Sequence, residues 1–188
     1  MKKTFKIAVI LALVLSFCGC FDYREIEESY VVSAVGFDKA QDNFIVYLEA
    51  ANSEKNRVFL ASGKDFNAAF KNIGKQFAKE PEFSHTACIV LGDRLDSEAQ
   101  RAAIAFCGDI KNLSLTAGVI GTRDTASLLG CEPYDETVGF DILKILKKNK
   151  LESSLFYEFA VGSEILLPCF EATSEGVVLL ENRRRYIG

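Results

Sequence analysis

The sequence lacks tryptophan and has one histidine, one methionine and three prolines among its 188 residues. The single histidine, His85, follows Ser84, and neighbouring residues of an extended chain point to opposite faces, so these two do not form a nucleophile and base by adjacency. Neither Cys-x-x-Cys nor His-x-x-x-His spacing occurs after residue 20, which argues against a zinc site. Gly118 and Gly121 are not followed by the Lys-Ser/Thr of a nucleotide-binding loop. We therefore interpret His85 as a structural or boundary histidine and expect no metal, no cofactor and no enzyme activity.

The sequence also has no apolar run of the roughly 20 residues that a membrane-spanning helix needs. Its longest apolar core, residues 7–17, follows the positive residues Lys2, Lys3 and Lys6 and ends in Cys-Gly-Cys. This pattern is typical of a bacterial lipoprotein signal. Gly19 is the small residue that the modifying pathway favours before the cysteine, so we predict a signal peptide over residues 1–19 and lipidation at Cys20. An uncleaved N-terminal anchor and an ordinary secretory signal are the alternatives.

Residues 20–188 have the length of a single domain. The net charge of the whole chain is −4, and removal of the three signal lysines makes it more negative. This balance argues against binding to nucleic acid or to an anionic membrane surface. Attachment to the membrane would then depend on the acyl chains of a diacylglyceryl anchor.

Apart from Cys18 and Cys20, the chain has four cysteines, at positions 88, 107, 131 and 169. An exported domain with four cysteines can form two disulfides in three pairings. Cys88 lies in an apolar run and Cys107 on an expected helix, which favours free cysteines that pack as small apolar residues. Free thiols are our interpretation, and disulfides are the alternative.

Residues 30–37 and 43–51 are rich in β-branched and aromatic residues and predict a hairpin around the polar residues 38–42. Further strands are expected at 58–61, 86–91 and 115–121, and closing strands at 177–180 and 184–187.

Helices are expected after the caps Asp65 and Ser97, as a turn at 125–129 and over 140–148, with residues 153–165 helical in their first half. Pro81 is expected to stop the first helix. The face of the second helix is expected to hold Ala102, Ala103 and Phe106. The order predicts an α+β or mixed α/β fold, in which a mixed, partly parallel sheet with an N-terminal hairpin is covered by helices.

The sequence contains two charged stretches. Residues 24–28 come directly after the expected anchor, and residues 183–185 are three arginines near the end. Such runs are usually solvated. The alternative is a docking surface for a neighbouring membrane protein, since a lipid anchor would hold both runs close to the bilayer.

The segment Gly-Cys-Phe-Asp-Tyr-Arg-Glu-Ile at residues 19–26 resembles the Gly-Cys-Trp-Asp-x-Arg-Glu-Ile opening of the Ger(x)C lipoproteins, the C subunits of spore germinant receptors. The resemblance continues at Val-Gly-Phe-Asp (35–38) and at Phe-Ser-His (83–85) before the apolar strand 89–92. It covers the family's N-terminal domain, and the family's substantial C-terminal region has no counterpart in this chain. Phe21 stands where the family has tryptophan.

The resemblance implies a non-catalytic, lipid-anchored subunit that acts in spore germination. It implies a location on the outer face of the cytoplasmic membrane, which is the spore inner membrane, and integral membrane subunits of a germinant receptor as partners. Asp22, Arg24 and Glu25, next to the lipidated Cys20, are the expected partner-binding residues. The alternative function is a membrane lipoprotein that binds a small ligand, and an exported enzyme is a third possibility.

Overall fold

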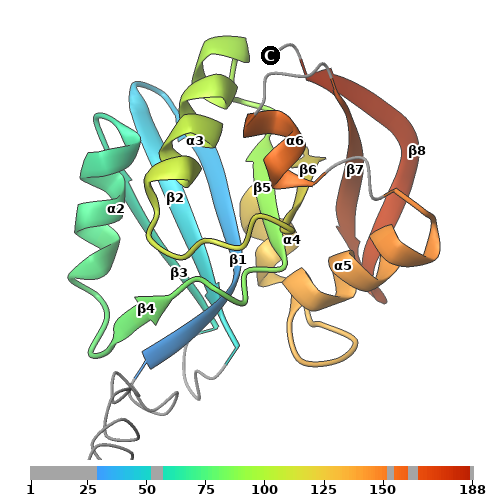
Figure 1. Ribbon diagram of the computed structural model, residues 1–188, viewed down its shortest axis with the longest axis horizontal. Helices are drawn as coiled ribbons and strands as arrows, with labels where there is room; N and C mark the ends of the chain where they lie inside the picture. The colour runs from blue at the N-terminus through green and yellow to red at the C-terminus, as the bar shows by residue number, and fades with distance from the viewer. Residues whose placement is uncertain (1–28, 52–56, 152–154, 161–164, 187–188) are drawn as a thin grey trace, which may run out of the picture.

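The computed structural model describes residues 29–51, 57–151, 155–160 and 165–186, which form one mixed β-sheet with helices on both faces (Figure 1). The strands are β1 (Ser29–Ala40), β2 (Asn43–Ala50), β3 (Val58–Gly63), β4 (Glu80–Glu82), β5 (Cys88–Gly92), β6 (Gly118–Thr122), β7 (Ile165–Thr173) and β8 (Gly176–Tyr186). The helices are α2 (Phe66–Gly74), α3 (Ser97–Asp109), α4 (Thr125–Gly130), α5 (Val138–Lys148) and α6 (Phe156–Ala160). The expected fold class is confirmed.

The order of the strands in the sheet is β3-β2-β1-β5-β6-β7-β8, and β4 pairs with the start of β1. β1, β5, β6 and β7 run parallel, whereas β2, β3 and β8 are antiparallel to their neighbours. The first strand therefore lies inside the sheet, with β2 on one side and β4 and β5 on the other. The carboxyl ends of the parallel strands meet at one edge of the sheet, and their amino ends meet at the opposite edge.

The N-terminal hairpin is confirmed, with a tighter turn than the sequence suggested. β1 continues through Asp38 to Ala40 and pairs there with Asn43, so only two residues form the turn. Gln41 at the turn has a φ of 53°. Positive φ in a two-residue turn matches the right-handed twist of the paired strands.

Two apolar cores lie on the two faces of the sheet. The first is formed with α2, α3 and α6, which contribute Phe66, Ile73, Phe106 and Phe156 among others. The second is formed with α4 and α5, which contribute Leu128, Leu129, Ile142 and Leu146. In Figure 1, α2 and α3 lie in front of the sheet and α4 lies behind it. Among the described helices, none has the length and apolarity needed to cross a membrane.

The helix boundaries agree with the expected ones in some places and differ in others. Asp65 caps α2 as predicted, and its side chain accepts a hydrogen bond from the amide of Ala68 at 2.7 Å. α3 is capped by Asp96, not Ser97, because the Asp96 carboxylate accepts from the amide of Ala99 at 2.8 Å. Ala102 is exposed, so its expected place in the packing face of α3 was wrong. That face is made instead by Ala99, Ala103, Ile104, Phe106 and Cys107.

Other expectations about strands and helix ends were also wrong. α2 ends at Gly74, before Pro81, and Pro81 lies in the short strand β4. β7 was not predicted, and β8 is one continuous strand where two short ones were expected. Pro168 stands where the β7–β8 register shifts, between Leu167 and Cys169. An irregular register accommodates proline, which cannot donate to the ladder.

Candidate functional site

The residues expected to carry function directly, Cys20, Asp22, Arg24 and Glu25, lie outside the described residues. The described part begins at Ser29, the first residue of β1, at the amino edge of the sheet. The polar features within the described part are a buried carboxylate at α5, an ion pair at the carboxyl edge and a cavity at the amino edge.

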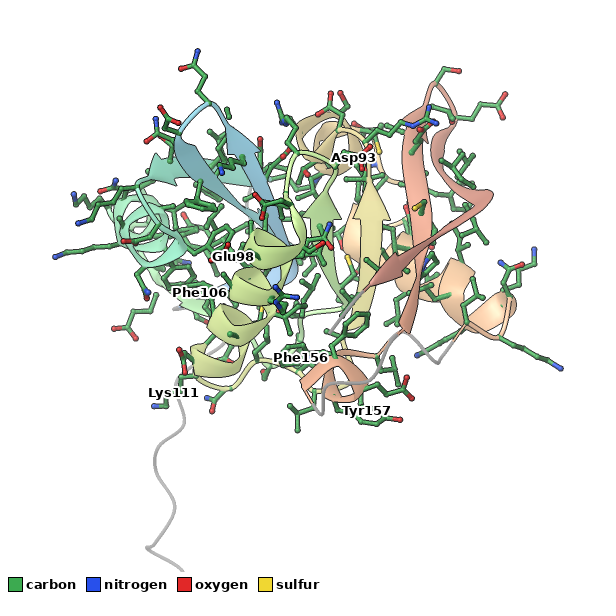
Figure 2. All side chains as sticks on the ribbon, turned by 90° about the horizontal axis from the view of Figure 1, so that it is seen from above. Asp93, Glu98, Phe106, Lys111, Phe156 and Tyr157 are labelled. Atoms are coloured by element: carbon green, nitrogen blue, oxygen red, sulfur yellow. The ribbon has the colours of Figure 1, made fainter. Side chains whose placement is uncertain are left out.

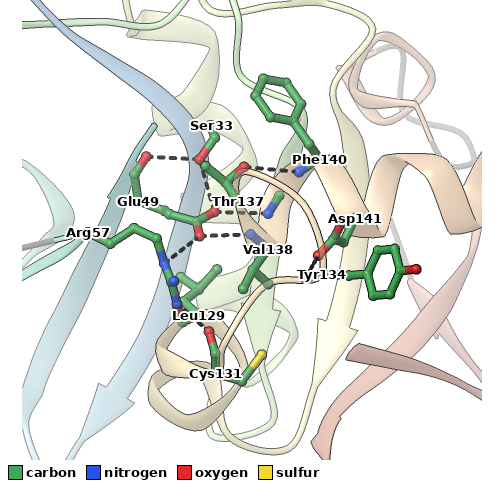
Figure 3. Close-up of polar contacts among 11 residues, drawn as sticks. Ser33, Glu49, Arg57, Leu129, Cys131, Tyr134, Thr137, Val138, Phe140 and Asp141 are labelled. Carbon is green, nitrogen blue, oxygen red and sulfur yellow. Dashed lines mark hydrogen bonds and ion pairs between the residues drawn. The ribbon is translucent and has the colours of Figure 1, made fainter. Parts of the chain in front are cut away.

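A buried carboxylate from the middle of the sheet holds the start of α5 (Figure 3). Glu49 on β2 is fully buried and accepts hydrogen bonds from the amides of Val138 and Gly139, each at 2.9 Å. Ser33 on the neighbouring strand donates to the same carboxylate at 2.9 Å. Thr137, the N-cap residue, accepts from the amide of Phe140 at 3.3 Å, so the first three amides of α5 all have acceptors. A carboxylate at this place also interacts favourably with the positive end of the helix dipole.

Arg57 links the same carboxylate to the end of α4. Its Nε lies 3.2 Å from Oε1 of Glu49, and its terminal nitrogen donates to the carbonyl oxygens of Cys131 and Leu129. Burial raises the pKa of Glu49, while the hydrogen bonds from Gly139, Val138 and Ser33 and the charge of Arg57 oppose the rise. The guanidinium therefore joins the carbonyl end of α4 to the carboxylate that caps α5, and it fixes both helices on one face.

Gly139 makes this close approach possible. A Cβ at this position would lie 2.6 Å from the carbonyl oxygen of Ser33 and 3.2 Å from the side chain of Ala34. Only a residue without a side chain allows the first turn of α5 to rest directly on the backbone of β1. Asp141 in the same turn accepts from the amide of Tyr134 at 2.6 Å and so holds the loop before α5.

A second ion pair occupies the carboxyl edge of the parallel strands. Asp38 near the end of β1 is fully buried and accepts from Arg94 at 3.0 and 2.5 Å and from the amide of Lys39 at 2.8 Å. Gly92 leaves room for the pair, since a Cβ there would lie 2.6 Å from the Asp38 carboxyl carbon. Open α/β sheets often bind ligands outside these strand ends. Here the Asp38–Arg94 pair fills part of that space.

The amino edge of the sheet holds a cavity of about 750 Å³. Its walls come from the start of β1, from β4 with the Phe83-Ser84-His85 stretch, from α2 and from the carboxyl end of α3. His85 is exposed at this cavity, a few residues before β5, as expected of a boundary histidine and not of one packed in the core. The sequence signal for this site was the Phe-Ser-His stretch, although nothing in the sequence showed that α3 would face it.

Among the described residues, no group of three or more His, Cys, Asp and Glu side chains is placed to hold a metal ion. Within the described part of the chain, Cys88, Cys107, Cys131 and Cys169 form no disulfide, in agreement with our interpretation of the sequence. Burial raises the pKa of the Cys88 and Cys107 thiols, which makes them poor nucleophiles at neutral pH.

The comparisons with known proteins identify the family. The family model described as "Spore germination protein N-terminal domain" matches residues 22–162, three quarters of the chain. This chain belongs to that family. The match of this spore germination domain includes the Glu49–Arg57 contacts and the cavity at the amino edge, and it ends before β7. The resemblance to the N-terminal domain of the Ger(x)C proteins is thereby confirmed.

A relative of the germination domain carries a more specific name. "Spore germination protein KC" of Bacillus subtilis (strain 168) is 22% identical over 113 residues. The match covers 52% of this chain and 28% of the relative, so the chain spans less than a third of the relative's length. No solved structure matches the chain.

Proposed function

We propose that this chain acts in spore germination as a non-catalytic, lipid-anchored subunit of a nutrient germinant receptor. The observation that carries the proposal is the family match over residues 22–162. The name of the Bacillus subtilis relative supports the same role. In this proposal, a signal peptide over residues 1–19 precedes a single α/β domain over residues 20–188. The domain acts through contacts with integral membrane subunits of the receptor.

The anchor in this proposal is a diacylglyceryl group on Cys20, which holds the protein on the outer face of the cytoplasmic membrane, the spore inner membrane. Two acyl chains on one residue suffice for stable attachment. The nine steps from Cys20 to Ser29 span at most about 30 Å when fully extended. The amino edge of the sheet would then stay close to the bilayer, and Asp22, Arg24 and Glu25 would meet partner subunits in this narrow space.

The test of the anchor is isolation of the protein and its partners from spore inner membranes, with mass spectrometry of the N-terminal peptide. We expect the unaltered protein to carry a diacylglyceryl group on Cys20 and to co-purify with multi-spanning receptor subunits. Cys20→Ala should leave the membrane fraction and lose these partners, whereas the matched control Cys18→Ala should keep both. A Cys20→Ala protein that stays in the membrane with its partners would contradict the anchor.

The docking residues have a separate test in the lipidated protein. Arg24→Ala should keep the lipid and the membrane location and lose most of the co-purifying subunits. Arg101→Ala removes an exposed arginine of α3 and should keep them. Normal germination of spores without this protein, in every nutrient tried and without a paralogue, would overturn the receptor role itself. The alternative of a small-ligand-binding lipoprotein would then take its place.

A further inference from the structure

The walls of the cavity at the amino edge of the sheet carry both acidic and basic side chains. Glu80, Glu82 and Asp109 line it, and Lys111 and His85 are the basic residues among its walls. The carboxylate of Glu82 accepts from the amide of Ser84 at 2.9 Å, and this bond lowers the pKa of Glu82. The carboxylate is therefore ionised well below neutral pH and is held in a fixed orientation.

The carboxyl end of α3 adds to the negative field. Phe106, Asp109 and Ile110 from this end line the cavity, and the last turn of the helix contains no basic residue. The carbonyl end of a helix carries a partial negative charge that cations stabilise and acids destabilise. Asp109 as the last residue of α3 therefore costs stability where it stands. An attractive partner for Asp109 is expected to come from outside the helix.

Aromatic side chains form the apolar part of the walls. Phe70 of α2 and Phe106 of α3 lie with ring centroids 5.3 Å apart at 66°, and Phe70 and Phe83 lie 5.8 Å apart. All three line the cavity. Figure 2 shows Phe106 and Lys111 at one end of α3 and Glu98 toward the other. Aromatic rings accept apolar groups by contact and also attract cations at their faces.

We propose that this cavity binds a small organic cation with an apolar body, of the class of primary aralkyl amines. Its volume lies within the range of small-molecule sites, roughly 300–1,000 Å³. The ammonium group would lie between Glu82 and Asp109 near the end of α3, and the apolar body would lie against Phe70 and Phe106. Lys111 opposes the cation. This assignment goes beyond the receptor role and does not depend on the lipid anchor.

The test is a titration of the isotope-labelled full chain in non-ionic detergent micelles, followed by amide chemical shifts. The probes are phenethylamine as the cation, 2-phenylethanol as its neutral analogue and 3-phenylpropionate as an anion. We expect phenethylamine to shift the amides of Ser84, His85, Lys111 and Asn112 with saturation, and to bind more weakly as salt is added. The alcohol and the anion should not saturate these shifts.

Charge variants make the assignment specific. Glu82→Gln and Asp109→Asn should each weaken phenethylamine binding about three- to five-fold, and Lys111→Gln should strengthen it about two-fold, the size of effect that ion pairs at an exposed surface have. Glu98→Gln, which removes a carboxylate from the other end of α3, should leave the affinity unchanged. All four positions lie at the surface or only partly buried, so the variants should fold.

Three results would overturn the proposal. The first is equal binding of 2-phenylethanol, which would make the interaction apolar and unselective. The second is an affinity for phenethylamine that is the same in Glu82→Gln and Asp109→Asn as in the natural protein. Amide chemical-shift changes that lie away from the cavity would count in the same way. The third is binding of a lysine-rich peptide without binding of phenethylamine, which would make the cavity a docking site for a basic segment of a partner protein.

Discussion

Glu49 on β2 is an acidic residue that is fully buried. Three hydrogen-bond donors and the Arg57 guanidinium surround its carboxylate. A buried hydrogen-bond donor that loses its acceptor typically costs about 1–3 kcal/mol. The contacts of Glu49 therefore contribute to the stability with which α4 and α5 pack on the sheet.

Glu49→Gln should lower the stability of the folded protein. The amide group of glutamine would turn a donor toward an amide of α5 and leave both donors without an acceptor, so we expect a loss of about 1–3 kcal/mol in unfolding free energy at neutral pH. Urea unfolding followed by circular dichroism measures this loss. Glu175→Gln, in the exposed turn between β7 and β8, is the control and should change stability by less than about 0.5 kcal/mol.

The pH dependence of the same residue gives the second prediction. Burial raises the pKa of Glu49 in the folded protein above the usual glutamate value of 4.5. The folded state then binds the proton more tightly than the unfolded state, so the contribution of Glu49 to stability is full below about pH 4.5 and falls as the pH rises through the folded pKa. The difference in unfolding free energy between the natural protein and Glu49→Gln should shrink over this interval. A difference that grows with pH would contradict the raised pKa.

At the scale of single elements, the contact between α5 and β1 depends on a missing side chain. Gly139→Ala would place a Cβ 2.6 Å from the carbonyl oxygen of Ser33 on an interior strand that cannot move aside. We expect a cost of about 2 kcal/mol from this overpacking. Gly108→Ala in α3 is the matched control, because a Cβ there meets nothing within 4 Å. That variant should gain about 0.5–1 kcal/mol through helix propensity. Thermal unfolding of both variants would show opposite shifts.

Side chains from α2 and from the turn that follows it cover the β3 edge of the sheet. Asn72 donates to the carbonyl oxygen of Ser62 at 3.0 Å, and Gln76 donates to that of Leu60 at 2.8 Å. Unpaired edge carbonyls invite pairing with another chain. We expect the double variant Asn72→Ala/Gln76→Ala to self-associate, as measured by sedimentation velocity, while Lys71→Ala on the exposed side of α2 stays unchanged. A double variant with the same sedimentation as the natural protein would show that these bonds do not protect the edge.

The periodicity of apolar residues predicted the elements whose apolar side chains repeat at the spacing of their buried face. The hairpin of β1 and β2, and helices α2 and α5, follow apolar spacing and capping residues that a short window contains. β7 was missed because Pro168 interrupts its apolar run, and β8 was divided because Glu181-Asn182 resembles a turn. Both strands are set by pairing with each other, which no local window contains.

The buried carboxylate could not be predicted for a similar reason. The alternation of Phe44, Val46, Leu48 and Ala50 places Glu49 on the opposite face of β2, a face that is often solvated in antiparallel sheets. Here α4 and α5, from about 80 residues further along the chain, cover that face, and the first amides of α5 donate to Glu49. A charged residue with apolar neighbours on a strand is the signal that could have pointed to Glu49. The identity of its partners needed the fold.

At the scale of the whole molecule, the two apolar cores share the same strands. Val35 and Ile89 face the core with α2 and α3, and their neighbours Ala34 and Val90 face the core with α4 and α5. Because each strand serves both cores, loss of one core removes the support of the other. The described sheet should therefore unfold in one cooperative step.

Two native cysteines test this prediction from opposite faces. Cys107 lies in the first core and Cys88 in the second, and both are fully buried. Pulsed thiol labelling across a urea gradient, with peptide mapping, should give the same midpoint for both residues. Cys131 is only half-buried and should react at lower urea. A lower midpoint for Cys88 than for Cys107 would show that the α4–α5 side opens independently.

The place of β1 in the sheet has a mechanical consequence. β1 pairs with other strands along both of its edges, with β2 along most of one edge and with β4 and β5 along the other. Tension applied through the chain before Ser29 would pull β1 along its own axis. Many ladder bonds would then carry the load together in shear, whereas an edge strand pulled sideways would unzip one bond at a time. A protein tethered through this strand can bear strain from its attachment without losing its fold.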